Sequence, residues 1–116
     1  MTIASDALAK RIRPLLARRQ GIVEKKMFGG TAFMLFGNMA VGTTAKGEML
    51  VRVDPKKQDL ALKRSGAFQM SMGERAMSGF VAVSADAVSD VDELKSWITY
   101  ALDYAKTLPP KLPSPK

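Results

Sequence analysis

The chain has 116 residues, 47% hydrophobic and 25% charged, which is typical of one soluble globular domain with a single core. It contains neither cysteine nor histidine, which excludes disulfides, thiolate chemistry, the usual zinc sites and a Ser-His-Asp triad. The net charge is +7: lysine and arginine dominate residues 1–28 and 55–75, and carboxylates dominate residues 76–108. This uneven charge favours an anionic partner without identifying it.

The sequence has no signal for a membrane or for export. No apolar run approaches the ~20 residues that span a bilayer. Lys10 and Arg11 come before any long apolar stretch, unlike the order found in a signal peptide. We therefore expect a cytoplasmic protein with no membrane contact.

The N-terminal segment has the periodicity of a helix. Ser5 or Asp6 can cap it, and Pro14 predicts a kink or a restart, because proline removes a backbone donor and clashes with the preceding turn. We expect Gly21 to end the helix. The apolar positions at helical spacing are Leu8, Ile12, Leu15 and Leu16.

The stretch from Met27 to Ala45 carries no charge and predicts the centre of a sheet. Apolar runs at 33–36, 39–44 and 49–53 are separated by glycine-marked turns, which indicates a three-stranded antiparallel meander. Residues 23–28 could form a short lead-in strand, and the sequence leaves this open.

The second half predicts a helix, two strands and a last helix. Asp54-Pro55 begins a helix that runs to about Arg64, and alternation predicts strands at 68–72 and 79–83 with a loop at 73–75. Ser89 opens the last helix, and Trp97 is expected in the core between that helix and the sheet. The apolar stripe of this helix comprises Val91, Leu94, Ile98, Ala101, Ala105 and Leu108.

Two features invite a functional interpretation that the sequence does not favour. Gly29-Gly30 lacks the spacing of a phosphate-binding loop, so a hairpin turn or bulge is the better interpretation. Eight methionines could form an adaptable binding surface, but most fall on predicted strands, where ordinary core filling is expected.

Basic residues form the remaining candidate site. Lys25-Lys26, Arg52, Lys63-Arg64 and Arg75 could gather into one face for phosphate contacts, although no base-stacking aromatics are interleaved with them. The sequence offers no spacing typical of catalytic, cofactor-binding or metal-binding residues. The residues predicted to contact a partner or nucleic acid are Arg11, Arg18, Lys25, Lys26 and Arg52.

The chain resembles the N-terminal domain of the TfoX/Sxy competence regulators over roughly residues 8–108. The resemblance rests on Met27-Phe28-Gly29-Gly30, Phe33, Gly37-Asn38-Met39, Leu50-Val51-Arg52-Val53-Asp54, Gly66-Ala67, Gly79-Phe80, Leu94, Trp97, Ala101 and Tyr104-Ala105.

This resemblance implies a two-layer α+β fold of the secretion-chaperone-like type, with an antiparallel five-stranded sheet in the order α-β3-α-β2-α. It implies a domain over residues 1–108, followed by a mobile Pro/Lys-rich tail at 109–116. Full-length members activate DNA-uptake genes together with the cyclic-AMP receptor protein and carry a helical C-terminal domain; here we expect a single stand-alone domain. The family supplies no catalytic residues.

The resulting expectation is a non-enzymatic regulatory module without cofactors that binds a protein of the transcription machinery or a regulator, with a homodimer possible. The alternative is a direct, mainly electrostatic nucleic-acid-binding protein that uses the basic N-terminal helix and the Arg52 side of the sheet.

Overall fold

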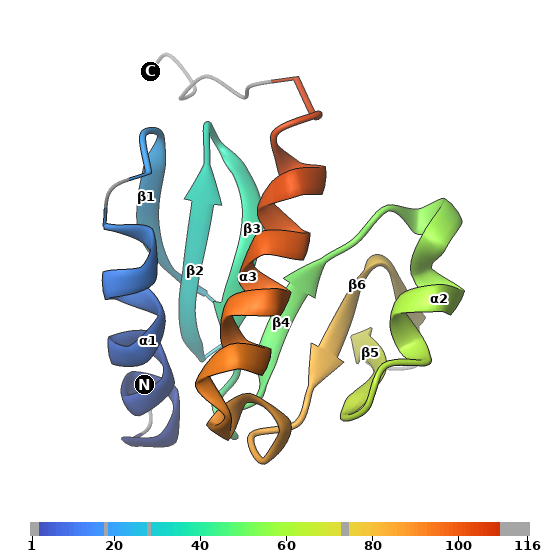
Figure 1. Cartoon of the computed structure of the whole chain (residues 1–116), viewed down its shortest axis with the longest axis horizontal. Helices are drawn as coiled ribbons and strands as arrows, with labels where there is room; N and C mark the ends of the chain where they lie inside the picture. The colour runs from blue at the N-terminus through green and yellow to red at the C-terminus, as the bar shows by residue number, and fades with distance from the viewer. Residues whose placement is uncertain (1–2, 18, 28, 73–74, 110–116) are drawn as a thin grey trace.

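A computed structural model of the chain describes residues 3–17, 19–27, 29–72 and 75–109, and the side chains of residues 27, 70–72 and 75–78 lie outside the description. Three α-helices accompany one sheet in these residues (Figure 1). In chain order the elements are α1 (Ile3–Leu16), β1 (Ile22–Met27), β2 (Gly30–Leu35), β3 (Asn38–Thr43), β4 (Met49–Arg52), the 3₁₀ turn η1 (Pro55–Lys57), α2 (Gln58–Leu62), β5 (Ala67–Met72), β6 (Arg75–Val83), the 3₁₀ turn η2 (Ala87–Ser89) and α3 (Val91–Ala105).

The sheet has six strands, so the prediction of five strands is wrong. All neighbours are antiparallel, in the order β1-β2-β3-β4-β6-β5. The predicted order of three strands before the middle helix is also wrong, because the uncertain lead-in segment forms β1 and makes four. Exposed charges at residues 24–26 hid this edge strand, which buries little on either side.

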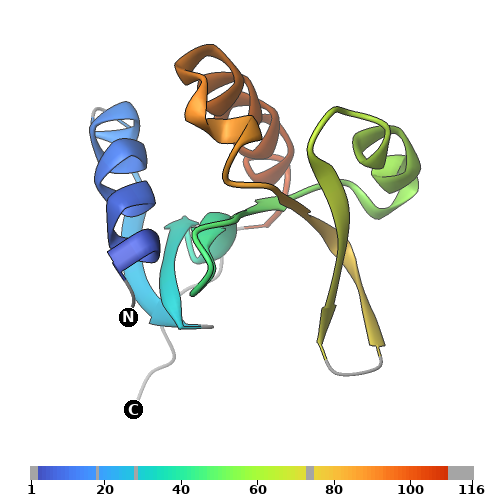
Figure 2. The same cartoon turned by 90° about the horizontal axis from the view of Figure 1, so that it is seen from below.

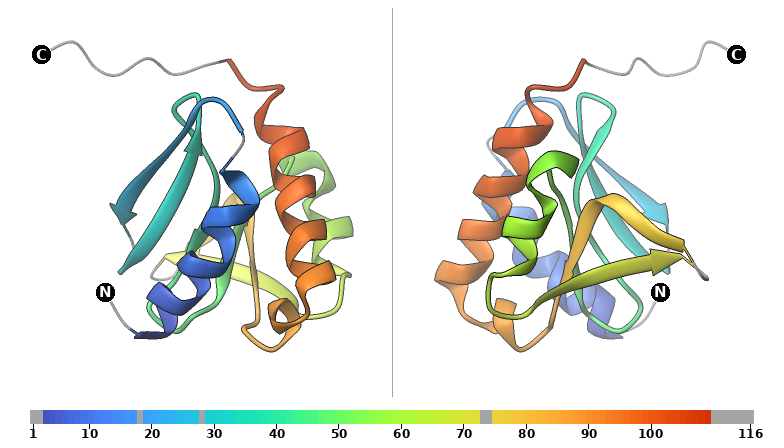
Figure 3. Two further views of the ribbon diagram at one scale, coloured as in Figure 1. Left: turned by 60° about the vertical axis from the view of Figure 1, so that its left-hand side comes forward. Right: turned by 90° about the vertical axis from the view of Figure 1, so that its right-hand side faces the viewer.

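All three α-helices lie on one side of the sheet, so the fold has two layers (Figure 2). α1 contacts β2 and β3, and α3 contacts β3 and β4. The short α2 lies against β5 and β6, at the far end of the sheet (Figure 3). The predicted α+β class is confirmed, whereas the likeness to secretion chaperones stays a prediction.

The helix boundaries correct several predictions. α1 begins at Ile3 and continues through Pro14 to Leu16, so Ser5 does not cap it and the helix neither restarts nor extends to Gly21. Ser5 is buried, and its hydroxyl lies 2.7 Å from that of Thr43. The cap of α3 is Asp90, whose carboxylate accepts a hydrogen bond from the Asp92 amide, and the predicted Ser89 lies in η2.

The middle helix begins as predicted. The Asp54 carboxylate accepts a hydrogen bond from the Lys56 amide, and Pro55 opens η1, which leads directly into α2. α2 ends at Leu62, close to the predicted end at Arg64. The predicted loop at 73–75 lies mostly outside the described residues, as does the tail from residue 110.

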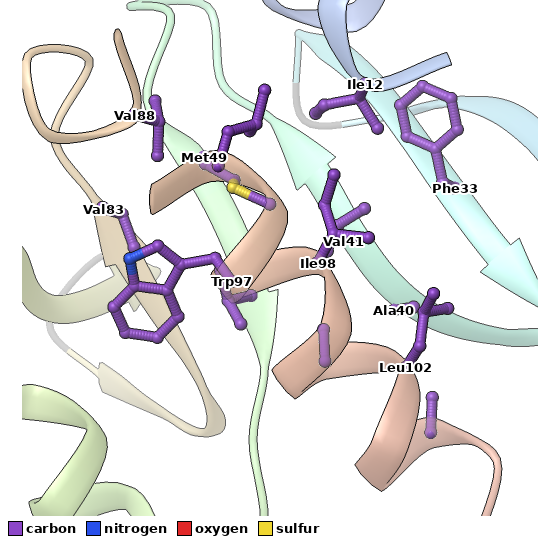
Figure 4. Packing of buried hydrophobic residues seen from close by; sticks show 14 of the residues in the cluster. Ile12, Phe33, Ala40, Val41, Met49, Val83, Val88, Trp97, Ile98 and Leu102 are labelled. Atoms are coloured by element: carbon purple, nitrogen blue, oxygen red, sulfur yellow. The ribbon is translucent and has the colours of Figure 1, made fainter. Parts of the chain in front are cut away.

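Trp97 lies at the centre of the core, as predicted. Its side chain is 0% exposed between α3 and the sheet, in one cluster with Val83, Met49 and Ile98 (Figure 4). The guanidinium of Arg64 lies 3.7 Å from the ring centroid and closes the cluster from the α2 side. Two members of the predicted stripe are wrong: Val91 is 51% exposed at the first turn of α3, and Leu108 lies beyond the end of α3 at Ala105.

Truncating Trp97 should leave the largest cavity that one substitution can create here. Trp97→Ala should lower the free energy of unfolding by about 3–5 kcal/mol. Urea denaturation followed by circular dichroism measures the loss. An unchanged midpoint would show that the indole is not in the core.

Gly29 in the β1–β2 turn and Gly30, the first residue of β2, each require glycine, for two different reasons. Gly29 has a φ of +74°, which L residues other than glycine rarely adopt. At Gly30 an added Cβ would lie 2.0 Å from the carbonyl oxygen of Thr43, a backbone atom of β3. The interpretation as a turn agrees with the positive φ of Gly29.

Alanine at these two positions should therefore have unequal effects. Gly29→Ala should cost about 1–2 kcal/mol for the left-handed backbone. Gly30→Ala should cost more, because β3 must move away from the new methyl group. Thermal unfolding of the two variants compares them, and equal losses would contradict this account of Gly30.

Candidate functional site

The side of the sheet away from the helices forms the candidate site, and we call it the open face. Paired residues of antiparallel strands project to the same side, so the ladder defines its members. The open-face residues with described side chains are Val23, Lys25, Ala32, Met34, Met39, Leu50, Arg52, Phe68, Phe80 and Ala82.

A bulge in β3 gives the open face its methionines. Phe33 pairs with Val41 and Met34 pairs with Met39, so Ala40 is an extra residue. Ala40 and Val41 therefore both join the core on the helix side. Met34 and Met39 consequently stand side by side on the open face.

The middle of the open face is apolar and closely packed. Ala32, Leu50 and Ala82 are buried there, although no helix of the described residues covers them. Met39 extends along β3, since a Cβ added at Gly42 would lie 2.6 Å from Met39 Cε. Met39 is itself buried in this cluster, whereas Met34 is partly exposed and could adapt to a partner.

Exposed apolar side chains and cations surround this middle. Val23 on edge strand β1 is 55% exposed, and Phe68 on the opposite edge strand β5 is 38% exposed. Lys25 is exposed, and the guanidinium of Arg52 lies 5.0 Å from the ring centroid of Phe80. Such an arrangement can bind apolar and anionic groups together.

The structure does not bring the predicted contact residues onto one surface. Lys25 and Arg52 are on the open face, but Lys26 pairs with Thr31 and shares the helix side with the Glu24–Phe33 pair. Arg11 is on α1, where its Nη2 donates to the carbonyl oxygen of Ser89 at 3.1 Å. Arg18 lies outside the described residues, so its contact role stays a prediction.

The wider basic face proposed from the sequence is divided in the same way. Arg64 lies over Trp97 on the helix side, donates to Ser96 Oγ at 2.9 Å and is 3.6 Å from Glu93. The side chain of Arg75 lies outside the description. A single basic plane for phosphates therefore does not form from the described cations.

Phe36 is a candidate residue that sequence reasoning missed. It occupies the β2–β3 turn with a φ of +49° and is 50% exposed. Gly37 follows with a φ of +86°, so both central turn residues are left-handed, the pattern of a type I′ hairpin. The sequence predicted a strand through Phe36 with its turn at Gly37-Asn38, whereas the turn consists of Phe36 and Gly37, and Asn38 already begins β3.

One ion pair links α1 to the edge of the sheet. Arg13 Nε donates to Glu24 Oε2 at 2.6 Å, and Arg13 Nη2 donates to Oε1 at 2.9 Å. These hydrogen bonds lower the pKa of Glu24 and raise the pKa of Arg13, and partial burial of Glu24 opposes its shift. The pair forms one wall of a pocket of about 160 Å³ with Leu16, Ile22 and Phe33.

A hollow of about 430 Å³ lies along the outer side of α3. Arg64, Lys95, Asp92 and Asp103 line it, so positive and negative charges balance, and Tyr100 is its main aromatic. Among the residues that the structure describes, no three carboxylates gather as a metal site. None of the helices in the described part combines the length and apolar character that crossing a membrane requires.

Comparison with known proteins gives one match. The family model described as the TfoX N-terminal domain matches residues 14–105, from the last turn of α1 to the end of α3. The match covers most of the 116-residue chain. No curated protein and no solved structure matches it.

The ion pair gives a pH dependence with a definite sign. Because folding lowers the pKa of Glu24, its contribution to stability is present at neutral pH and is lost as the pH falls through that lowered pKa. Glu24→Gln should therefore be slightly less stable than the unchanged chain at neutral pH, and the difference should shrink in acid. The effect is small, because both side chains are well exposed to solvent. Urea midpoints at a series of pH values measure it, and a difference that grows on acidification would contradict it.

Proposed function

The chain belongs to the TfoX N-terminal domain family, and from this premise we propose that it is a non-enzymatic regulatory module that acts by binding another protein. In this proposal the module occupies residues 1–108 and works in the cytoplasm, in transcription regulation of the competence type. Its partner is a protein of the transcription machinery or a regulator of it.

The open face carries the proposal. One side of the sheet holds the core, and the other presents Val23, Met34 and Phe68 to solvent, beside Lys25 and Arg52. Apolar surface of this kind, edged by polar groups, is typical of protein interaction sites. The family and the surface therefore support the same class of function.

Catalysis has less support. The Thr44 hydroxyl donates to Glu48 Oε1 over a long 3.4 Å, within a turn whose Lys46 and Glu48 amides donate to the same hydroxyl, and the hollow along α3 has balanced charges. Glu24 is the one described carboxylate with a clearly shifted pKa, and its partner is a surface arginine on α1. A shift of this kind belongs to an ion pair that joins two elements.

Nucleic-acid binding is the second candidate function, and the net charge of +7 favours it. Its weakness is geometric, because the cations with described positions are divided between the two sides of the sheet. Such a distribution supports loose, salt-sensitive attraction more than a specific complex.

Affinity capture from the source cell, after nuclease treatment, tests the proposed function. The purified chain should retain a defined protein that rebinds when both are purified, and retention should survive physiological salt. Capture of no protein that rebinds would contradict the proposal. In parallel, a gel-shift assay with duplex DNA over a series of salt concentrations measures nucleic-acid binding.

For DNA we expect weak, non-specific binding at low salt that disappears near physiological salt. Changing Lys25 and Lys26 together to glutamate should weaken this binding for all sequences alike and flatten its salt slope, with little change in melting temperature. The matched control changes Lys63 and Lys95 to glutamate. Both lysines are exposed, Lys63 directly after α2 and Lys95 on α3. A sub-micromolar, sequence-selective complex at physiological salt would favour the nucleic-acid function instead.

A further inference from the structure

We propose that the open face, together with Phe36, docks an acidic amphipathic segment of a partner protein. The inference rests on the proposed function and adds the place of binding and the chemistry of the partner. The segment would carry apolar side chains for the exposed residues Val23, Met34 and Phe36, and glutamate or aspartate for the cations of the face.

A row of apolar side chains supplies the contact area. Val23 pairs with Met34, and Met34 pairs with Met39, so the three lie next to one another across β1, β2 and β3. Val23 is more than half exposed and Met34 is partly exposed. Met39 is already buried, so association would remove the apolar surface of Val23 and Met34 from water.

Charge complementarity selects the occupant. The only charged side chains that the strand register places on the described part of the open face are Lys25 and Arg52, and both are cations. Neither cation forms an ion pair with the described residues, and Glu24 of β1 points to the helix side, where it pairs with Arg13. An acidic segment therefore meets attraction on this face, whereas a basic segment meets repulsion.

Phe36 adjoins the exposed end of the row. It follows Met34 by two residues, and its ring lies over Gly21, where an added Cβ would be 2.5 Å from Phe36 Cε1. Gly21 precedes Val23 by two residues, so the ring and the row form one apolar surface. The Phe36 amide also donates to the Gly21 carbonyl oxygen at 2.8 Å, which fixes the turn against the start of β1.

The backbone of Phe36 argues for a role beyond folding. A bulky residue at positive φ is strained, and asparagine before glycine is the favoured pair in this hairpin. Keeping a half-exposed phenylalanine there costs stability that asparagine would not. Aromatic anchors of this kind dominate the affinity of protein interfaces.

Two synthetic peptides test the partner chemistry. One interleaves leucine and phenylalanine with glutamate, and its matched control replaces every glutamate with lysine. Titration of the ¹⁵N-labelled chain should show binding of the acidic peptide, with shifts concentrated at Val23, Met34 and Phe36. Affinity for the lysine peptide should be at least about tenfold weaker, and added salt should narrow the difference.

Variants then locate the contact. Phe36→Asn should weaken the acidic peptide by about tenfold while the melting temperature stays equal or rises. Lys25→Glu with Arg52→Gln should abolish the preference for the acidic peptide. The control, Lys63→Glu with Lys95→Glu on the helix side, should bind as the unchanged chain does.

Several outcomes would overturn the inference. They are equal binding of both peptides, shifts confined to the helix side, or full affinity in Phe36→Asn with a lowered melting temperature, which would make Phe36 purely structural. Displacement of the acidic peptide by duplex DNA at physiological salt would assign the face to nucleic acid. Displacement by self-association of the chain, measured by sedimentation, would assign it to a second copy. If a captured protein binds the unchanged chain and the Phe36→Asn variant equally well, the proposed function is supported, but this docking site is contradicted.

Discussion

The burial of α3 against one side of the sheet is the interaction on which the rest of this structure depends. Trp97, Ile98 and Ala101 place their side chains on β3 and β4, and they do so from a helix that follows every strand in the chain. The sheet alone would leave the apolar side chains of its core side in water, and such a side is stable only when another element buries it. With α3 in place, α1 and α2 complete the same layer.

This one-sided cover has a consequence for the other side. Strand residues alternate between the two sides, so each strand that supplies the core also presents a second set of side chains. In β2 the core residues Phe33 and Leu35 alternate with Ala32 and Met34 on the open face. Both sets are apolar, although a side that only faced water would carry polar residues. Ala32 is nevertheless buried, so the apolar surface that remains exposed there is that of Met34 and of its neighbour Val23.

The sequence predicted the parts whose periodicity was unambiguous. The spacing of Leu94, Ile98 and Ala101 and the capping chemistry of Asp54 located their elements, because helix period and helix capping are local properties. The sequence did not decide whether β1 forms, because Glu24 to Lys26 lack the apolar alternation by which a strand is recognised. The candidate site could not be predicted in the same way. Apolar residues on both sides of β2 and the extra residue at Ala40 hid which methionines face the core, and the left-handed turn at Phe36 depends on its contact with Gly21.

The central claim is that the open face is accessible in the free protein and is covered by the partner, and the methionine methyl groups report on both. NMR of methyl-labelled methionine with a soluble paramagnetic agent measures access to each methyl. The account predicts strong broadening of Met34 and protection of Met49, which is 0% exposed in the core, and it predicts that bound partner protects Met34 without changing Met49. Equal protection of Met34 and Met49 in the free protein, or a Met34 signal that the bound partner leaves broadened, would contradict it.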